Sequence, residues 1–199
     1  MVSFGPSGAL AQGAGHVTTL MSTKPTCADI FRQHGAMVFR LLRRLGVPDA
    51  DLDDLTQDVF VAVHRSLERY EERNQLRAWI YKICVREASR HRRDAPPRGQ
   101  PLDELDAPSP EASPEAALQA SQARADFDRL LGALDEARRT VFVLYEIEQL
   151  PMAEVAAAVG CPLQTAYSRL RSARELIVER AHRLEAERAR DVHAPRRTR

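Results

Sequence analysis

The sequence lacks the features of a secreted or membrane-spanning protein. Its 199 residues include only three cysteines, Cys27, Cys84 and Cys161, which are far apart and odd in number. This pattern argues against a disulfide framework and favours a reducing compartment. No run of about 18 apolar residues is present, and the N-terminus lacks the basic and apolar stretches of a secretory signal. We therefore expect a cytoplasmic protein that does not insert into a membrane.

Metal-binding and strand patterns are also absent. The sequence has no CxxC or CxxxH pair, and its six histidines are scattered. We therefore expect neither a metal nor another cofactor. No segment alternates between apolar and polar residues for long enough to predict a strand, so the expected fold class is all-α.

Charge is nearly balanced overall but separated along the chain. The formal net charge is +1, and charged residues make up 29% of the sequence. From Leu163 to the end there are ten Arg and five Asp or Glu residues, whereas Asp103 to Glu115 holds five acidic residues and no basic one. A basic C-terminal part in a nearly neutral chain fits a local anion-binding surface.

The apolar spacing and the prolines divide the chain into two small helical domains. Residues 1–25 are rich in Gly, Ser, Thr and Ala and are expected to be a disordered tail. Three amphipathic helices are predicted within 26–94. Six prolines with acidic residues between them predict a flexible linker over 95–116. A second helical domain is expected over 117–182, with Phe127 on its core side, and a basic tail over 183–199.

A helix-turn-helix pattern lies between Leu150 and Arg174. Apolar residues at i, i+3, i+4 and i+7 form one face of a short helix, Gly160 is suited to end it, and Pro162 is suited to start the next. The second helix directs short polar side chains and arginines outward, as a recognition helix in the DNA major groove does. An ordinary helical hairpin with a solvated basic face has the same spacing. The outward residues are Gln164, Thr165, Tyr167, Ser168, Arg169, Arg171 and Arg174.

Acidic residues gather where the second helix of the first domain is expected to begin. Helix capping explains Asp49 to Asp54 in part, because acidic side chains complement a helix N-terminus. They also leave a polar, acidic surface that could recruit a basic partner. A metal-dependent carboxylate enzyme is an alternative, but the nearest histidine, His64, lies six residues from Asp58. That spacing does not place the two side by side on a helix.

Three stretches, in this order, resemble one protein family. Residues 51–60 read DLDDLTQDVF and match a D-x-x-D-L-x-Q-[DE]-x-F signature, and residues 76–83 read LRAWIYKI around a single tryptophan. Residues 134–142 read LDEARRTVF and precede the helix-turn-helix. Together they resemble a sigma factor of bacterial RNA polymerase, of the extracytoplasmic-function group of the sigma-70 family. The resemblance covers about Asp29 to Arg93, called region 2, and Ala125 to Ile177, called region 4.

The resemblance implies three sets of binding residues. Region 2 would dock on core RNA polymerase and open promoter DNA at its minus-ten element, and region 4 would read the minus-thirty-five element. The polymerase-binding set is Asp51, Asp54, Leu55, Gln57 and Asp58. The minus-ten set is Tyr70, Arg73, Arg77, Trp79, Tyr81, Lys82, Arg86 and Arg90. The minus-thirty-five set is Arg138 and the seven outward residues of the second helix, with Arg139 as a further phosphate candidate.

The sequence departs from the family pattern at three of these positions. The family usually has Asn where Arg86 stands and Asp where Arg90 stands, so these arginines should strengthen phosphate attraction. It often has Lys or a small polar residue where Tyr167 stands. These differences bear on which promoter bases the chain prefers.

The resemblance also implies partners and regulation. The partners would be core RNA polymerase, promoter DNA and an anti-sigma factor that masks the protein until a stress or extracytoplasmic signal arrives. The polymerase does the chemistry, so we expect no enzymatic activity of the chain itself. The alternative is a stand-alone helix-turn-helix regulator, which would bind duplex DNA tightly without polymerase. The N-terminal half shows no effector or receiver pattern that would support that alternative.

Overall fold

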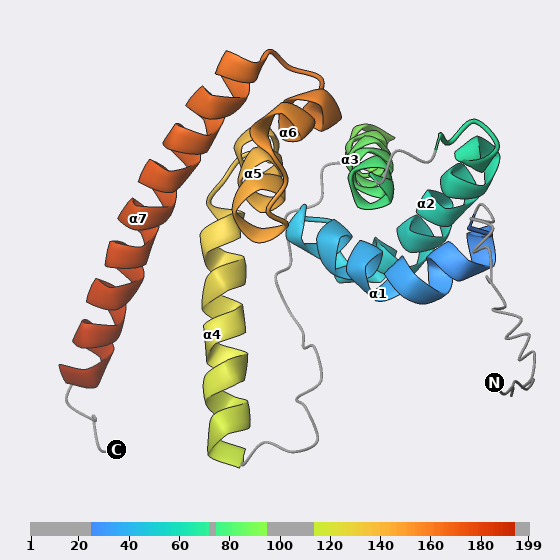
Figure 1. Cartoon of the computed structure of the whole chain (residues 1–199). Coiled ribbons are helices and arrows are strands. Elements are labelled where there is room, and N and C mark those ends of the chain that lie inside the picture. The colour runs from blue at the N-terminus through green and yellow to red at the C-terminus, as the bar shows by residue number, and fades with distance from the viewer. Residues whose placement is uncertain (1–24, 72–74, 95–113, 194–199) are drawn as a thin grey trace, which may run out of the picture.

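The computed structural model describes residues 25–71, 75–94 and 114–193. All regular elements in these ranges are helices or helical turns, which confirms the all-α prediction. Figure 1 shows two groups of helices side by side. The N-terminal bundle consists of α1 (Cys27–Arg44), the 3-10 turn η1 (Asp49–Asp51), α2 (Leu52–Leu67) and α3 (Leu76–Asp94). The C-terminal bundle consists of α4 (Pro114–Gly132), α5 (Glu136–Phe142), the π-helical turn η2 (Val143–Ile147), α6 (Met152–Val159) and α7 (Leu163–His193).

Helix α1 has defined stops at both ends. The Thr26 hydroxyl accepts the Asp29 backbone N–H at 3.2 Å, and the Asp29 carboxylate accepts the Thr26 N–H at 3.1 Å. This reciprocal capping box satisfies two N–H groups that the helix itself leaves unpaired. After the helix, Gly46 adopts a φ of 89°, a backbone conformation that residues with a Cβ atom rarely adopt. The chain therefore turns sharply into η1, as the Gly-Val-Pro sequence predicts.

The helix-turn-helix forms where the sequence predicts it. Helix α6 ends at Gly160, which has a φ of 72° and donates its N–H to the Ala156 carbonyl. A left-handed glycine is a common way to end a helix. The inward face of α7 consists of small and branched residues, and Ala166, Leu170 and Ala173 are buried. Small side chains allow α7 to pack closely against α5 and α6.

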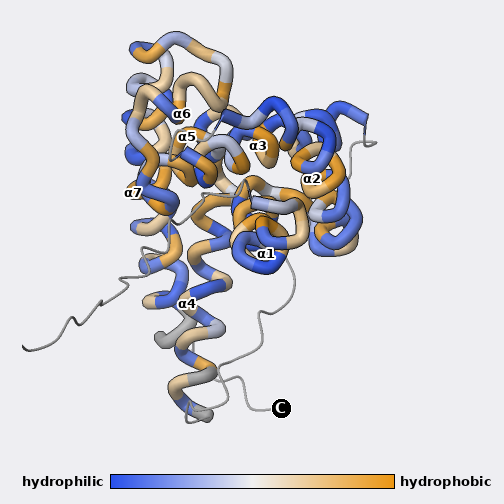
Figure 2. Tube along the Cα trace, turned by 45° about the vertical axis from the view of Figure 1, so that its right-hand side comes forward, coloured by the Kyte–Doolittle hydropathy of each residue, from blue (hydrophilic) through white to orange (hydrophobic). Residues whose placement is uncertain are grey.

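Two helices extend beyond their predicted bounds. Helix α4 begins at Pro114, within the predicted linker, because proline is tolerated in the first turn of a helix. Helix α7 continues to His193, through much of the predicted tail. Figures 1 and 2 show the N-terminal part of α4 projecting away from the rest of the molecule. Phe127 is 36% exposed, so the prediction that it belongs to the core is wrong.

The two bundles share a single hydrophobic core. Buried residues of α1 and α3, such as Leu45 and Ile80, belong to the same cluster as Leu131, Leu144 and Met152 of the C-terminal bundle. Helix α3 packs against α6, so the first helix of the helix-turn-helix lies directly on the N-terminal bundle. None of the helices in the described ranges is long and apolar enough to cross a membrane. The predicted N-terminal tail up to residue 24, linker residues 95–113 and residues 194–199 lie outside these ranges.

Candidate functional site

The acidic face predicted on α2 is exposed. Asp54, Gln57 and Asp58 are solvent-accessible, and they lie at i, i+3 and i+4 on one side of the helix. Leu55 is only 4% exposed and belongs to the core of the bundle. The structure therefore places Leu55 beneath the polar face and not on it. Its packing fixes the rotation of α2 and so the direction in which its polar neighbours point.

Asp51 has a partner inside the protein. Its carboxylate lies 3.1 Å from Nε2 of His91, near the end of α3. Both side chains are about three-quarters buried, at 24% and 25% exposure. The pair connects η1 to α3, so Asp51 contributes to the packing of the N-terminal bundle. Among the acidic residues of the predicted polymerase-binding set, only Asp54 and Asp58 are fully on the surface.

An aromatic pair lies at the start of α3. The rings of Tyr70 and Trp79 are 4.7 Å apart between centroids, and Tyr70 is buried while Trp79 is half-buried. With Lys82 they line an open groove of about 340 Å³. The opposite wall of this groove comes from α6, through Glu154, Ala157 and Ala158. The predicted minus-ten surface thus faces the C-terminal bundle. Arg73 lies outside the described residues.

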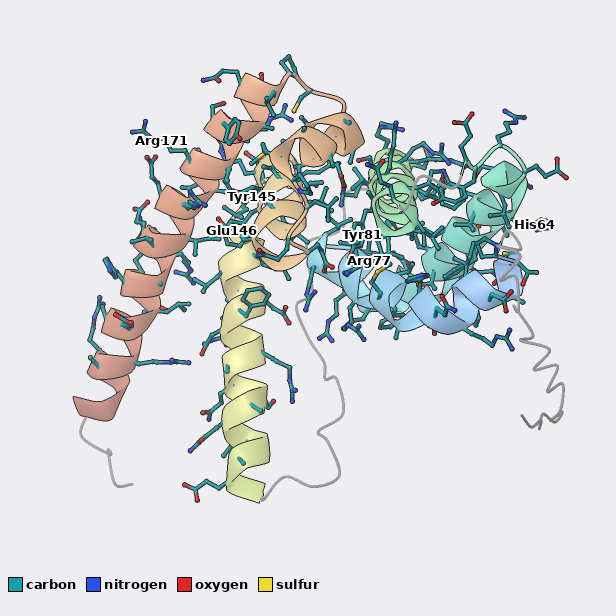
Figure 3. The ribbon with its side chains drawn as sticks, in the orientation of Figure 1. His64, Arg77, Tyr81, Tyr145, Glu146 and Arg171 are labelled. Carbon is teal, nitrogen blue, oxygen red and sulfur yellow. The ribbon has the colours of Figure 1, made fainter. Side chains whose placement is uncertain are left out.

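Tyr81 lies at the centre of a polar cluster between the bundles. Its hydroxyl donates to Oε2 of Glu148 at 2.6 Å and accepts from Nη2 of Arg77 at 2.7 Å. Arg44 of α1 donates to the other oxygen of Glu148 at 2.8 Å. Burial, together with the hydrogen bond to Glu148, raises the pKa of Tyr81 to about 12. Figure 3 shows Arg77 and Tyr81 in the space between α3 and α1.

The two unusual arginines of α3 share one carboxylate. Glu87 is 7% exposed, and its oxygens lie 3.0 Å from Arg86 and 3.6 Å from Arg90. Both guanidinium groups remain largely in solvent, at 64% and 70% exposure. Their net contribution to phosphate attraction is therefore smaller than two free arginines would give, because Glu87 neutralises part of it.

The outward face of α7 is available for contact. Tyr167 is 48% exposed, and the Arg171 side chain is 84% exposed and pairs with Glu175 of the same helix at 3.1 Å. In Figure 3 Arg171 points away from the rest of the molecule. Gln164 and Ser168 are exposed, while Thr165 and Arg169 are partly buried. Arg174 pairs with Glu146 at 2.6 Å and lies over the Tyr145 ring.

The adjacent arginines Arg138 and Arg139 have different roles. Arg138 is half-buried, and its guanidinium contacts Asp135 and Ser172. Arg139 is 6% exposed and donates to the carbonyls of Leu131 at 2.9 Å and Leu134 at 3.2 Å. It therefore satisfies carbonyls at the end of α4, which a helix leaves unpaired. The expectation that Arg139 contacts phosphate is wrong in this structure, because its guanidinium is buried.

Sequence reasoning missed the side chains that connect the bundles. Glu136 accepts from Arg92 at 2.6 Å and from Ser89 at 2.7 Å, which joins α5 to α3. Burial opposes ionisation of Glu136, but these hydrogen bonds outweigh it and lower its pKa. Glu136 lies within the 134–142 stretch and Glu148 lies two residues before the helix-turn-helix, but neither position carries a local signal of a distant partner. In the described part of the chain, no three His, Cys, Asp or Glu side chains are grouped to hold a metal ion.

Comparison with known families matches both halves of the chain. A model of sigma-70 region 2 matches residues 30–96, and a model of sigma-70 region 4 matches residues 124–177. The chain belongs to the sigma-70 family of RNA polymerase sigma factors, and its relatives place it in the extracytoplasmic-function group. Region 2 corresponds to the N-terminal bundle, and region 4 to α5, η2, α6 and the adjoining parts of α4 and α7.

Curated relatives carry sigma-factor names. The chain is 32% identical over 158 residues to the extracytoplasmic-function sigma factor SigE of Mycolicibacterium smegmatis, covering 76% of this chain and 60% of that protein. It is 29% identical over 161 residues to the sigma factor CnrH of Cupriavidus metallidurans, covering 73% and 81%. It is 29% identical over 142 residues to the sigma-E factor of Escherichia coli K12, covering 66% and 74%. The chain thus spans less than two thirds of SigE.

Two solved structures share the fold. CnrH in complex with the cytosolic domain of CnrY matches with a TM-score of 0.56 and 25% identity, covering 80% of this chain and 88% of that one. The sigma factor RpoE of Bartonella quintana, in complex with the anti-sigma factor NepR, matches with a TM-score of 0.61 and 19% identity. That match covers 78% of this chain and 96% of the other and supports the fold alone.

Proposed function

We propose that the chain is an alternative sigma factor that binds core RNA polymerase and directs promoter-specific transcription initiation in the cytoplasm. The observation that carries this proposal is the pairing of a region 2 bundle, with an exposed acidic face on α2, and a region 4 bundle, with an exposed recognition helix. Each alone fits many proteins, but together they fit a factor that joins polymerase to DNA. The chain supplies recognition, and the polymerase supplies the catalysis.

The acidic face of α2 supports polymerase docking. Asp54, Gln57 and Asp58 are exposed, while Leu55 and Val59 anchor the helix from below. Fixed carboxylates on a rigid helix attract a basic partner surface and orient it. The helix needs no rearrangement to present these three side chains.

The second function is reading DNA at two separate places. The aromatic pair Tyr70 and Trp79, beside Lys82, suits an unpaired strand, because bases stack on aromatic rings and phosphates pair with cations. Tyr167 and Arg171 on α7 suit the major groove of a duplex. The remaining members of the two DNA-binding sets are proposed in supporting roles. Tyr81 is buried in this structure and would contribute only after the bundles move apart.

We also propose regulation by an anti-sigma factor. The RpoE relative forms a complex with the anti-sigma factor NepR, and the CnrH relative forms one with the cytosolic domain of CnrY. A partner of this kind would release the chain when a stress or extracytoplasmic signal arrives. The α2 face and the groove between α3 and α6 are the surfaces on which such a partner would compete most directly.

Polymerase binding tests the proposed docking face. Purified protein mixed with sigma-free core polymerase should form a stable one-to-one complex, measured by size-exclusion chromatography and fluorescence anisotropy. Asp54→Arg should weaken it by roughly tenfold or more, because a lost charge-assisted contact and a new repulsion together exceed about 1.4 kcal/mol. Glu68→Arg is the matched control: the same charge reversal at the exposed residue that caps the C-terminal end of α2, about 21 Å further along. Tight, sequence-specific duplex binding without any polymerase binding would instead identify a stand-alone regulator.

Transcription tests the recognition helix. With polymerase present, Arg171→Ala should lower initiation from the gene's own upstream region, since a base or phosphate contact of this kind contributes about 1–3 kcal/mol. Arg183→Ala is the control, because Arg183 is an exposed arginine on the same helix, ion-paired within it to Glu179. Equal activity of Arg171→Ala and wild type would remove Arg171 from the proposed interface. Polymerase binding should be unchanged in both variants.

A further inference from the structure

Glu148 connects the two bundles through one carboxylate. It lies directly after η2 and before the helix-turn-helix, yet its side chain is only 8% exposed. Its hydrogen-bond and ion-pair partners within the described residues are Arg44 on α1 and Arg77 and Tyr81 on α3. All three belong to region 2. If the bundles separated, this carboxylate would lose every one of these contacts.

Further contacts hold the other end of the same interface. Glu136 accepts from Arg92 and Ser89 of α3, and Arg92 also donates to the Leu45 carbonyl at 2.8 Å. Arg139 of α5 packs against Gly46, where a single added Cβ atom would lie 1.8 Å from its Nη1. The bundles are therefore joined by several contacts besides those of Glu148, and these include an ion pair between Arg43 of α1 and Asp128 of α4 at 3.7 Å.

In the closed arrangement, region 4 contacts or covers the residues of region 2 that are proposed to bind the minus-ten element. Arg77 and Tyr81 contact Glu148, and Tyr70, Trp79 and Lys82 form one wall of the groove whose other wall is α6. A second groove, of about 400 Å³, runs beside it between Tyr70, Arg77 and Tyr81 on one side and Glu148, Leu150 and Pro151 on the other. An unpaired DNA strand would have to enter between region 2 and region 4 to reach these side chains.

The size of the closed body conflicts with reading both promoter elements at once. The longest element of the closed body, α7 with 31 residues, is about 46 Å long at 1.5 Å per residue. Two elements about 20 base pairs apart lie roughly 70 Å from each other along the duplex. The bundles must therefore move apart before one molecule can contact both elements.

We infer that the Glu148 carboxylate is an autoinhibitory latch, which holds region 4 over the minus-ten surface of region 2 and must release before the protein engages a promoter. The inference rests on the proposed function, since the hidden surface matters only if it binds DNA. The latch itself is a property of the isolated chain. Any partner that binds region 2 and region 4 at separate places favours the open form by its differential affinity.

Small-angle X-ray scattering of the full chain tests the latch without polymerase or DNA. Wild type should be compact, and Glu148→Lys should have a larger radius of gyration and maximum dimension, because it places a cation against Arg44 and Arg77. Glu148→Gln should give an intermediate increase. Glu146→Gln is the matched control: it removes a carboxylate two residues away whose ion pair, with Arg174, stays within region 4. Circular dichroism should report the same helical content in all four proteins.

A charge swap separates latch opening from misfolding. The double variant Glu148→Arg with Arg44→Glu restores an ion pair of opposite sense, so it should return towards the compact dimensions. An unchanged radius of gyration in a folded Glu148→Lys protein would overturn the latch, as would an already extended wild type. Either result would leave the polymerase-binding test untouched, because Asp54→Arg probes a different face.

DNA binding by the free chain tests the masking. The probe is a fluorescein-labelled single-stranded oligonucleotide from the gene's own upstream region, followed by anisotropy. Opening raises the fraction of binding-competent molecules, so Glu148→Lys should bind roughly threefold or more tightly than wild type. The charge-swapped double variant should bind like wild type. Glu146→Lys adds the same positive charge as Glu148→Lys but within region 4, so wild-type-like binding by Glu146→Lys would exclude the added charge as the cause. Equal binding by compact and extended variants would overturn the masking even if the latch opens.

Discussion

The two bundles are stabilised to different degrees by their cores. Among the described residues, eight Leu, Ile and Tyr side chains are less than 2% exposed, and only Leu144 of these belongs to the C-terminal bundle. The fully buried valines are divided equally between the two bundles. The C-terminal bundle has its large apolar residues at the margins, with Leu118 60% exposed and Val178 55% exposed. Burial of apolar area is the main source of stability. Region 2 therefore contributes more of the large side chains of the shared core than region 4 does.

The largest expected effect is a cavity in the N-terminal core. Leu41 is fully buried, so Leu41→Ala should lower the free energy of unfolding by about 2–5 kcal/mol. Val178→Ala, at an exposed position of α7, should lower it by less than about 0.5 kcal/mol. Urea unfolding followed by circular dichroism measures both. If the two variants lost similar stability, the contrast between the bundles would not hold.

Two glycines with positive φ allow the packing at the interface between the bundles to be compared with a position away from it. Gly46 and Gly160 both have positive φ, but a Cβ on Gly46 would overlap Arg139 while one on Gly160 would meet nothing within 4 Å. Gly160→Ala should therefore cost about 1 kcal/mol, from backbone conformation alone. Gly46→Ala should cost about 1–3 kcal/mol more, because the buried Arg139 guanidinium must shift away from the carbonyls that it satisfies.

A double-mutant cycle isolates the contribution of Arg139. In an Arg139→Ala background, Gly46→Ala should cost about as little as Gly160→Ala, since the overlapping atoms are gone. The unfolding free energies of the two single variants and the double variant give the coupling directly. If the losses of unfolding free energy were additive, residue 46 and Arg139 would not be in steric contact at the interface between the bundles.

Local patterns in the sequence predicted the parts of the fold that depend on local physics. The end of α6 at Gly160 and the start of α7 directly after Pro162 follow from propensity and spacing, and the structure has them. The contacts of Arg139, Glu136 and Glu148 depend on residues 44 to 104 positions away or on the packing of another helix. No periodicity records such contacts. Sequence reasoning therefore predicted the exposed face of α2 but assigned the buried Arg139 to phosphate binding.

The bounds of the helices show the same limit. The proline-rich segment predicts a linker through 116, yet Pro114 starts α4 because the first turn of a helix does not need its missing N–H. Phe127 fits an inward stripe by spacing, but it is 36% exposed, whereas Leu131, one turn further along α4, is buried. The burial of a side chain depends on which elements pack against its helix, and the spacing of apolar residues alone does not predict those elements.

A pH dependence of the interface between the bundles is expected only in alkaline solution. The pKa of Tyr81 is raised from 10.0 to about 12, first by burial and then by the hydrogen bond to Glu148, with Arg77 acting in the opposite direction. Because the folded protein favours the neutral phenol, this contribution is fully present below about pH 10. It is lost as the pH rises from 10 towards 12, where an ionised Tyr81 would face the Glu148 carboxylate. The stability of wild type should therefore fall more steeply over this range than that of Tyr81→Phe.

Tyr167→Phe provides the control for this measurement, because Tyr167 is 48% exposed on α7 and lies away from the interface between the bundles. The urea midpoint of unfolding is measured for all three proteins at several pH values between 10 and 12. Differences between the proteins then exclude the effect of the titrating groups that they share. Parallel curves for wild type and Tyr81→Phe would show that the phenol ionises without cost, and so that the bundles already separate there. If the stability of wild type and of Tyr167→Phe falls more steeply with pH than that of Tyr81→Phe, the pH-sensitive contact is located at Tyr81, where region 4 closes on region 2.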